Sequence, residues 1–440
     1  MKKILLVLIV LTSLTYNVHP SPGWFPQNSG TSETLNDVFF INNLTGWAVG
    51  DTGIIIKTTN GGINWFQQYN PNDRELLTVR FINENTGWAV GGQPNLNPYF
   101  CLDYMIILKT TNGGNNWIIQ LYSSNGDVIY GLNLINQNEV YLSYFGTEEG
   151  CMSSRGGISK TSNGGTNWTY IPNLGFGYGF GYKSVHFINQ NIGWAVGCAW
   201  SCTYSMTSII KTTNAGENWS ITYFDSSNYW SSPHTGKMLF VDEHNGYIIE
   251  DCIKKTTDGG YNWFNADSAS TMNARGLFFI NKDTGWMVKS NPIKRTDDGG
   301  LNWSLQYTPT TATLNSVYFI NNNTGWTAGA NGTILKTTTG GLTSVQQIST
   351  LIPEKSALFQ NYPNPFNPVT RITYNISSSG DVDLKVFDIS GREVATLVNE
   401  NQTPGTYEVV FDASSMPSGV YFYKLKAGDF VETRKMVVLK

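Results

Sequence analysis

A nine-residue phrase recurs along the chain at intervals of about 40 to 52 residues. It first reads KTTNGGINW, and most copies keep a basic residue, an Asn-Gly or Asp-Gly pair and a Trp. The basic residues that open the copies are Lys57, Lys109, Lys160, Lys211, Lys255, Arg295 and Lys336. A period of this length is typical of stacked or circular arrays of small structural units. The repeat therefore constrains the fold more than any other feature.

Each copy is preceded by a second phrase, such as VFFINNLTGWAVG, so that seven units with both phrases can be aligned. A unit contains four short runs of apolar and β-branched residues, which in the first unit are VFFI, GWAVG, IIIKTT and NWFQQ. Such runs predict strands, and the Asn-Gly pair predicts a hairpin turn between the last two. We expect the following Trp to wedge against the neighbouring blade. Four strands in each of seven units predict an all-β fold, a seven-bladed β-propeller.

The seventh unit ends after Gly341 without the strand that begins with Asn-Trp. The missing piece has a counterpart at the other end of the chain, where GWFPQ at residues 23–27 resembles NWFQQ. We therefore predict that the amino-terminal segment supplies the outermost strand of blade seven. Such a strand leaves no exposed sheet edge at the junction.

The composition is typical of an exported, turn-rich β protein, with 45 Gly, 13% aromatic residues and 14% charged residues. A net charge of −4 gives no basic surface field, so no nucleic-acid partner is expected. Lys2 and Lys3 precede the apolar run from Ile4 to Leu11, which predicts a signal peptide over residues 1–21. That run is shorter than the roughly 20 residues that span a bilayer, and no later stretch is long enough, so no transmembrane segment is predicted.

The two repeated phrases resemble the propeller repeats of the photosystem II assembly-factor type, which are related to the Asp-box repeats of bacterial neuraminidases. The resemblance covers about Trp24 to Gly341. It implies that the Asn-Gly turn lies away from the usual ligand face. It says little about function, because propellers of this kind serve many roles.

After the repeats the sequence changes to a Pro/Asn-rich stretch, which we interpret as a linker over residues 346–368 between a propeller at 22–345 and a second domain at 369–440. Alternating apolar residues and closely spaced turns in the second domain predict a small Ig-like β-sandwich. The phrases NYPNPFNP, DISGREV and SGVYFYKL resemble the sorting domain of the type IX secretion system. That resemblance implies the type IX machinery as a partner, and export through the periplasm to the outside or to the outer-membrane surface.

Extra sequence enters the links between the second and third strands of units two to four, and two of the links between units. In a four-stranded blade these links share one face, so we expect the inserts to gather on that face of blades two to five, where loops on a rigid scaffold usually carry recognition. Their aromatic residues suit a glycan or an envelope protein, although they could also pack on one another. The candidates are Tyr99, Phe100, Tyr104, Tyr178, Tyr182, Trp200, Tyr204, Tyr229 and Trp230.

One position in the first strand of each unit varies, and it includes Arg80, His186 and Tyr318. These three would line a polar pocket if that side faces the channel, or would be packing residues if it faces the neighbouring blade. Five cysteines are disulfide candidates in an exported chain. A local bridge between Cys198 and Cys202 and a bridge from Cys101 to Cys151 are both open, and an odd number leaves at least one thiol over.

A sialidase-like, glycan-degrading hydrolase is the enzymatic alternative. The arginines of the propeller are scattered, and Glu148 and Glu149 are adjacent, which is a poor arrangement for an acid and a nucleophile across a cleft. No catalytic residue, metal or cofactor is predicted, and catalysis is left open. The sequence favours a secreted or surface-displayed binding propeller, with the hydrolase and a passive structural or adhesive module as alternatives. It does not predict an oligomeric state.

Overall fold

The computed structural model divides the chain into two compact units, Gly23–Gly341 and a second one that contains Leu342–Lys440. The described residues are 23–93, 104–123, 127–147, 154–171, 180–201, 204–225, 236–250, 252–266, 274–289, 293–306, 308–341, 345–367, 369–413 and 416–439. The predicted signal peptide lies outside them. Among the described residues, the structure has no helix with the length and hydrophobicity that a membrane crossing requires.

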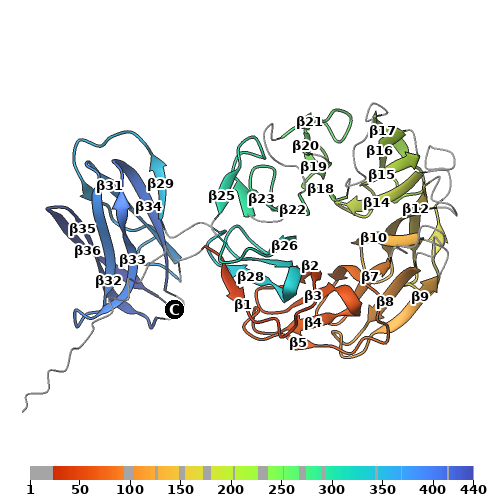
Figure 1. Cartoon of the computed structure of the whole chain (residues 1–440), viewed down its shortest axis with the longest axis horizontal. Coiled ribbons are helices and arrows are strands. Elements are labelled where there is room, and N and C mark those ends of the chain that lie inside the picture. Colours follow the sequence, from red (N-terminus) through yellow and green to blue (C-terminus); the bar gives the residue numbers. More distant parts are fainter. Residues whose placement is uncertain are drawn as a thin grey trace, which may run out of the picture. The chain divides into compact units, whose positions relative to one another are not determined.

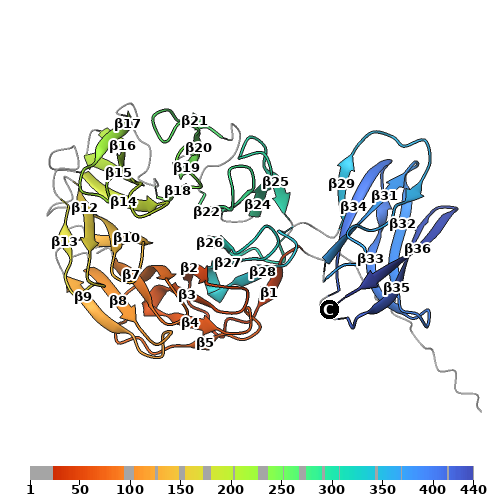
Figure 2. The ribbon, with the colours of Figure 1, turned by 180° about the vertical axis from the view of Figure 1, so that it is seen from behind.

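The described part of the first unit forms seven antiparallel four-stranded sheets in a ring (Figures 1 and 2). Blades one and two are β2 (Leu35–Phe40), β3 (Gly46–Gly50), β4 (Ile55–Thr58), β5 (Phe66–Gln67), and β6 (Leu76–Phe81), β7 (Gly87–Gln93), β8 (Tyr104–Thr110), β9 (Ile118–Ser123). Blades three and four are β10 (Asp127–Leu134), β11 (Val140–Thr147), β12 (Ser154–Thr161), β13 (Thr169–Tyr170), and β14 (Phe180–Phe187), β15 (Gly193–Ser201), β16 (Tyr204–Thr212), β17 (Ser220–Asp225).

Blades five and six are β18 (Met238–Phe240), β19 (Gly246–Ile249), β20 (Ile253–Thr256), β21 (Phe264–Asn265), and β22 (Gly276–Phe279), β23 (Gly285–Val288), β24 (Ile293–Thr296), β25 (Ser304–Gln306). Blade seven is β26 (Leu314–Phe319), β27 (Gly325–Gly329), β28 (Ile334–Thr337) and β1 (Phe25–Gln27). This arrangement confirms the predicted all-β propeller with seven blades.

The ring closes through the first described strand of the chain. Strand β1 pairs antiparallel with β28, with Phe25 opposite Lys336 and Gln27 opposite Ile334. Trp24 is fully buried beside this strand, in the core shared by blades six and seven. The predicted exchange of the last strand is therefore confirmed, and β1 covers the edge that β28 would otherwise expose.

The repeated phrase forms the turn between the third and fourth strands of each blade. In blade one, Thr58 Oγ1 accepts the Gly62 amide at 2.9 Å, and Asn60 Oδ1 accepts the Asn64 amide at 2.9 Å. Gly61 and Gly62 have φ of 71° and 95°, which residues with a side chain rarely adopt. The same Thr-to-Gly bond recurs in every blade, which explains why Thr and Gly keep their places in the phrase.

The basic residue of the phrase joins neighbouring blades. Lys57 Nζ donates to the Gly113 carbonyl of blade two at 2.9 Å, and Trp47 Nε1 donates to the same oxygen at 3.3 Å. The Trp47 ring is stacked on Phe81 of blade two with ring centroids 3.5 Å apart. The equivalent stacks are Tyr141–Phe187, Trp194–Phe240, Tyr247–Phe279, Trp286–Phe319 and Trp326–Phe40. An aromatic stack and a shared carbonyl thus fasten blade one to blade two, and the stack recurs at the other junctions named.

The Trp at the end of the phrase packs in the core shared with the preceding blade, as Trp65 does with Trp326 and Ile334 of blade seven. Trp65 meets Phe40 of its own blade edge to face, with ring centroids 5.8 Å apart. The Trp of the Gly-Trp phrase, such as Trp47, provides a stack on the following blade. The predicted packing of the Trp at the end of the phrase against a neighbouring blade is therefore confirmed.

The two ends of the ring differ. The Asn-Gly turns lie at one end beside the turns between the first and second strands, as the bond from the Gly61 amide to the Leu44 carbonyl at 2.7 Å shows. We call this the turn end. The links between the second and third strands, such as the 3-10 turns η1 (Asp51–Gly53) and η2 (Ala330–Gly332), lie at the opposite end, which we call the entry end. The Asn-Gly turn is thus at the far end from the inserts.

The second unit contains two four-stranded antiparallel sheets around one core. One sheet is β29 (Val345–Ser349), β34 (Gly405–Asp412), β31 (Val369–Ile376) and β30 (Ala357–Leu358), and the other is β33 (Glu393–Gln402), β32 (Gly380–Phe387), β35 (Gly419–Ala427) and β36 (Phe430–Val438). Both sheets contribute to the core, for example through Ile372 and Leu384. The unit is the predicted β-sandwich.

The interpretation of residues 346–368 as a linker does not hold, because this segment belongs to the sandwich. Strands β29 and β30 lie in one of its sheets. Asn361 is 2% exposed, and its amide donates to Tyr423 Oη at 2.8 Å. Phe366 is 3% exposed in the sandwich core. A Pro/Asn-rich composition was misleading here because the polar groups of the segment are satisfied inside the fold.

Candidate functional site

Three hairpins rise above the others at the entry end. In blade four, β15 and β16 span nine residues each, whereas β27 and β28 of blade seven span five and four. Both second strands begin at the same Gly-Trp pair, so the four extra residues of β15 add roughly 13 Å at the entry end. The hairpins β7–β8 and β11–β12 are extended in the same way. We call these three hairpins the raised rim.

The raised rim holds three of the predicted aromatic residues. Tyr104 pairs with Gln93, Trp200 with Ser205, and Tyr204 with Ser201 at its distal positions. Tyr182 is different, since it is 1% exposed in the core between blades three and four, and burial raises its pKa. Its proposed place on a binding surface is therefore wrong. The remaining aromatic candidates lie outside the described residues: Tyr99, Phe100, Tyr178, Tyr229 and Trp230.

Two cysteines lie within the described chain. Cys198 is buried in β15, opposite Thr207 in β16. The Cys252 thiol donates to Asn265 Oδ1 at 3.2 Å. The predicted disulfide partners Cys101, Cys151 and Cys202 lie outside the described residues.

The first strands of the blades surround a central cavity of about 510 Å³. Arg80, His186 and Tyr318 all line it, so the variable position found in the sequence faces the channel. Arg80 comes from β6, His186 from β14 and Tyr318 from β26. Of the two alternatives in the sequence analysis, the one in which these side chains face the channel therefore describes their positions.

One side of the channel is aromatic. The Tyr318 ring lies 5.0 Å from that of Phe39 and 5.1 Å from that of Phe278, between ring centroids. These residues belong to blades seven, one and six. Burial raises the pKa of Tyr318, so its hydroxyl stays neutral through the physiological range. This side therefore offers an apolar wall with one polar hydroxyl.

The channel contains an ion pair between the buried Asp37 of blade one and the half-buried Arg80 of blade two. Asp37 is 2% exposed, and its carboxylate also accepts the Ser316 hydroxyl at 2.7 Å and the Val79 amide at 3.1 Å. A carboxylate with an Arg and two further donors is well satisfied in its charged form. Asp37 therefore anchors Arg80 and closes the junction between blades one and seven.

His186 is neutral at physiological pH. Burial lowers its pKa to about 4, and the nearby Arg80 cation acts in the same direction. Its Nε2 lies 2.9 Å from the Phe240 carbonyl oxygen. Because a carbonyl oxygen can only accept, Nε2 carries the proton and Nδ1 is left as an acceptor.

Two lysines complete the polar side, and the sequence analysis missed both. Lys237 of blade five reaches the Asn315 carbonyl of blade seven, with Nζ 3.4 Å from the oxygen. Lys183 lies at the bulge of β14, with Nζ 4.9 Å from the centroid of the Phe145 ring. Burial lowers the pKa of both lysines. Alternate residues of a strand share a face, so the position two residues before the variable one also faces the channel. An alignment of the units would have shown that this position holds Asp37 in blade one and Lys237 in blade five.

In blade six, the residue equivalent to Asp37 and Lys237 is Gly276. A Cβ there would lie 3.0 Å from the Asn315 carbonyl oxygen, which is the atom that Lys237 contacts. A side chain at this position would therefore crowd the bond. Because Gly276 has no side chain, Lys237 can extend past blade six to blade seven.

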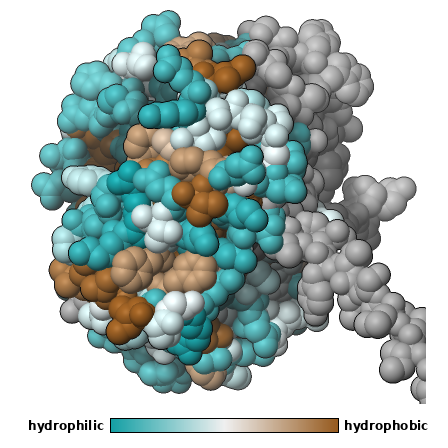
Figure 3. Space-filling view, turned by 90° about the vertical axis from the view of Figure 1, so that its left-hand side faces the viewer, coloured by the Kyte–Doolittle hydropathy of each residue, from teal (hydrophilic) through white to brown (hydrophobic). Residues whose placement is uncertain are grey.

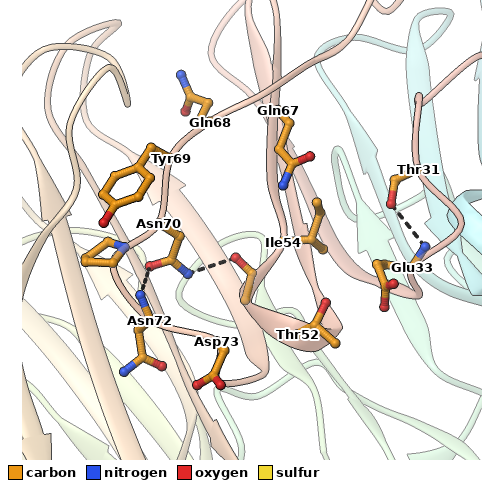
Figure 4. Close-up of a pocket in the computed structure, with 12 residues that line it drawn as sticks. Thr31, Glu33, Thr52, Ile54, Gln67, Gln68, Tyr69, Asn70, Asn72 and Asp73 are labelled. Atoms are coloured by element: carbon orange, nitrogen blue, oxygen red, sulfur yellow. Dashed lines mark hydrogen bonds between the residues drawn. The ribbon is translucent and has the colours of Figure 1, made fainter.

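A second cavity, of about 740 Å³, lies on blade one at the entry end (Figure 4). Its polar side chains are used to shape loops: Asn70 Nδ2 donates to the Gly53 carbonyl at 2.8 Å, and Asn70 Oδ1 accepts the Asn72 amide at 3.0 Å. Thr31 Oγ1 accepts the Glu33 amide at 3.0 Å. These bonds give the groove a structural explanation, so we place the candidate site in the channel.

A carboxylate pair lies beside this groove. Asn36 Nδ2 donates to Asp51 Oδ1 at 3.0 Å and to Glu75 Oε1 at 3.2 Å. Burial and the neighbouring Asp51 charge raise the pKa of Glu75 to about 7. The pair brings two acids from successive blades together through one amide.

On the side that Figure 3 presents, hydrophobic side chains lie in separate groups among hydrophilic ones. Apolar residues that are exposed singly are normal in soluble proteins.

Two family models match the chain. Residues 360–439 match the secretion system C-terminal sorting domain. Residues 17–177 match the photosynthesis system II assembly factor YCF48. The first match covers most of the sandwich, and the second covers blades one to three.

Solved structures agree on the fold. The chain resembles a structure of YCF48 bound to a D1 peptide at 19% identity and TM-score 0.53, covering 72% of this chain and 97% of that one. YCF48 from Cyanidioschyzon merolae gives 18% identity, TM-score 0.51, and coverage of 71% and 98%. The extracellular domain of BT4673, a putative one-component system of B. thetaiotaomicron, gives 11%, 0.53, and coverage of 96% and 60%. No curated protein matches the chain. The chain thus joins a β-propeller related to YCF48 to a C-terminal sorting domain of the type IX secretion system, and it is destined for secretion or the cell surface.

Proposed function

We propose that this protein is a secreted or cell-surface recognition propeller, and that it binds an envelope or surface protein at the raised rim. The observation that carries the proposal is the extension of β7–β8, β11–β12 and β15–β16 beyond the other blades. Loops carried by a rigid scaffold are where binding residues concentrate.

The extensions are not needed to close the ring. Trp326 of blade seven stacks on Phe40, and its Nε1 donates to the Gly61 carbonyl at 3.1 Å, in a blade whose second and third strands are short. Equivalent contacts hold the extended blades. The additional strand length is therefore more than ring closure requires, although part of it packs between blades, where Gly156 of β12 lies against Gly181 of β14.

A protein partner is favoured over a glycan because a propeller of the same fold, YCF48, is known in complex with a D1 peptide. The likeness is at the level of fold, so the identity of the partner does not transfer. Because the sorting domain implies secretion or surface display, the candidate partners are proteins that are found outside the cell or on its surface.

The test is capture from an outer-membrane extract with the full secreted chain. Alanine at Tyr104, Trp200 and Tyr204 together is expected to abolish capture of a specific protein. The matched control carries alanine at Ile63, Tyr261 and Leu301, which are exposed at the turn end, and should capture as the parent does. Equal capture by both variants would remove the raised rim as the site. Binding to a glycan array in the absence of any protein capture would replace the protein partner with a carbohydrate.

A further inference from the structure

The lining of the channel has more positive than negative groups. Arg80, Lys183 and Lys237 face one carboxylate, Asp37, among the described lining residues. That carboxylate is already engaged by Arg80, Ser316 and the Val79 amide. His186 adds no charge at neutral pH. An excess of cations in a partly enclosed space attracts an anion.

Lys237 is the group best placed to meet that anion. Its ammonium carries three donors. The contact with the Asn315 carbonyl, at 3.4 Å, is long for a hydrogen bond and uses one of them. The side chain reaches this carbonyl past Gly276, where a side chain would crowd the oxygen. The Lys237 side chain therefore extends into the cavity and does not lie along blade five.

Aromatic residues beside these cations, such as Phe39 under Arg80, select the body of the ligand. Phe39, Phe278 and Tyr318 form a continuous aromatic wall. Inorganic phosphate or sulfate would satisfy the cations and leave this wall unused. A ligand with an apolar body would use both, and about 510 Å³ lies within the range of small-molecule sites.

We propose that the propeller channel binds a small organic carboxylate with an aromatic or aliphatic body. The carboxylate lies against Lys237, with Arg80 held beside it by Asp37, and the body lies against Phe39, Phe278 and Tyr318. This site is separate from the protein contact at the raised rim, so either can fail without the other.

The experiment is calorimetric titration of the full chain with 4-phenylbutyrate, 4-phenylbutanol, acetate and inorganic phosphate. Only 4-phenylbutyrate is expected to bind measurably, because it alone has both the charge and the apolar body. Equal binding of the alcohol would overturn the role of the cations, and equal binding of acetate or phosphate would overturn that of the aromatic wall. Failure of all four to bind would overturn the site.

Variants then locate the binding. Lys237→Met keeps the apolar stem and should weaken 4-phenylbutyrate at least 10-fold, whereas Lys282→Met, on the outer surface, should leave it unchanged. Should Lys237→Met fail to fold, Phe278→Leu serves as the second variant and is expected to weaken 4-phenylbutyrate several-fold. Unchanged affinity in the folded channel variant overturns the proposal.

Discussion

Trp24 meets Phe319 edge to face, with ring centroids 5.7 Å apart, although the two residues come from opposite ends of the propeller sequence. The same geometry joins Trp65 to Phe40 within blade one. Trp24 Nε1 also donates to Gln306 Oε1 of blade six at 2.9 Å. The amino-terminal Trp thus takes the place of the residue that the seventh repeat lacks.

Replacing Trp24 with Ala should lower the free energy of unfolding of the propeller by about 3 to 5 kcal/mol, because a fully buried indole leaves a cavity at the closing junction. Urea unfolding followed by fluorescence measures the change. Phe25→Ala is the control, since Phe25 lies on the same strand with 42% of its surface exposed, and it should cost well under half as much. Equal costs would show that the strand, and not the Trp, closes the ring.

Removing the basic residue of one repeat should loosen one junction. Lys109 Nζ donates to the Gly164 carbonyl at 2.7 Å and lies 4.9 Å from the centroid of the Trp88 ring. Lys109→Met is expected to cost about 1 to 2 kcal/mol of unfolding free energy. Lys282→Met removes an exposed lysine that pairs with the adjacent, exposed Asp283 carboxylate, and it should be neutral. A neutral Lys109→Met would contradict the fastening role of the repeat.

His186 should make the fold sensitive to mild acid. Its pKa is lowered to about 4 from 6.5, so the unfolded chain binds the proton first as the pH falls. The free energy of unfolding is therefore highest above pH 6.5, and it falls by roughly 2 to 3 kcal/mol as the pH is lowered toward 4. His186→Gln, which can still donate to the Phe240 carbonyl, should flatten the unfolding free energy in this window. If the unfolding free energy of the His186→Gln variant still falls between pH 6.5 and pH 4, another group causes the pH dependence.

Glu75 should act in the opposite direction. Its pKa is raised to about 7, so the folded chain favours the protonated acid and loses stability as the pH rises from 4.5 to above 7. Glu75→Gln should therefore stabilise the propeller at pH 8 by about 1 kcal/mol, a value reduced for solvent screening of a partly exposed group. The gain should vanish near pH 4.5. Melting temperatures across this range test the sign, and the His186 measurement is best repeated in this background.

The sequence predicted the ring because its determinants are repeated. The Thr58–Gly62 turn and the Trp47–Phe81 stack recur with fixed spacing, so the number of blades and the role of Trp24 could be read from alignment of the units. The order of strands followed from the turns alone.

The site was less predictable because it depends on distances across the ring. The alternation of a strand assigns Arg80 and His186 to a face, but only the closed ring shows that Lys237 reaches blade seven. Tyr182 was misplaced because its neighbours in sequence are insert residues, whereas its ring packs in the core between blades three and four. Asn361 was assigned to a linker because composition does not reveal that its amide is buried against Tyr423.

The position of β1 ahead of all other described strands has a consequence for biogenesis. During synthesis the closing strand emerges before every blade, whereas its partner β28 appears only when the seventh is made. Until then Trp24 has no groove to enter, and the nascent ring stays unlatched. A trimming enzyme that removed a few residues too many from this end would therefore produce a molecule with every blade present and no means of locking the circle.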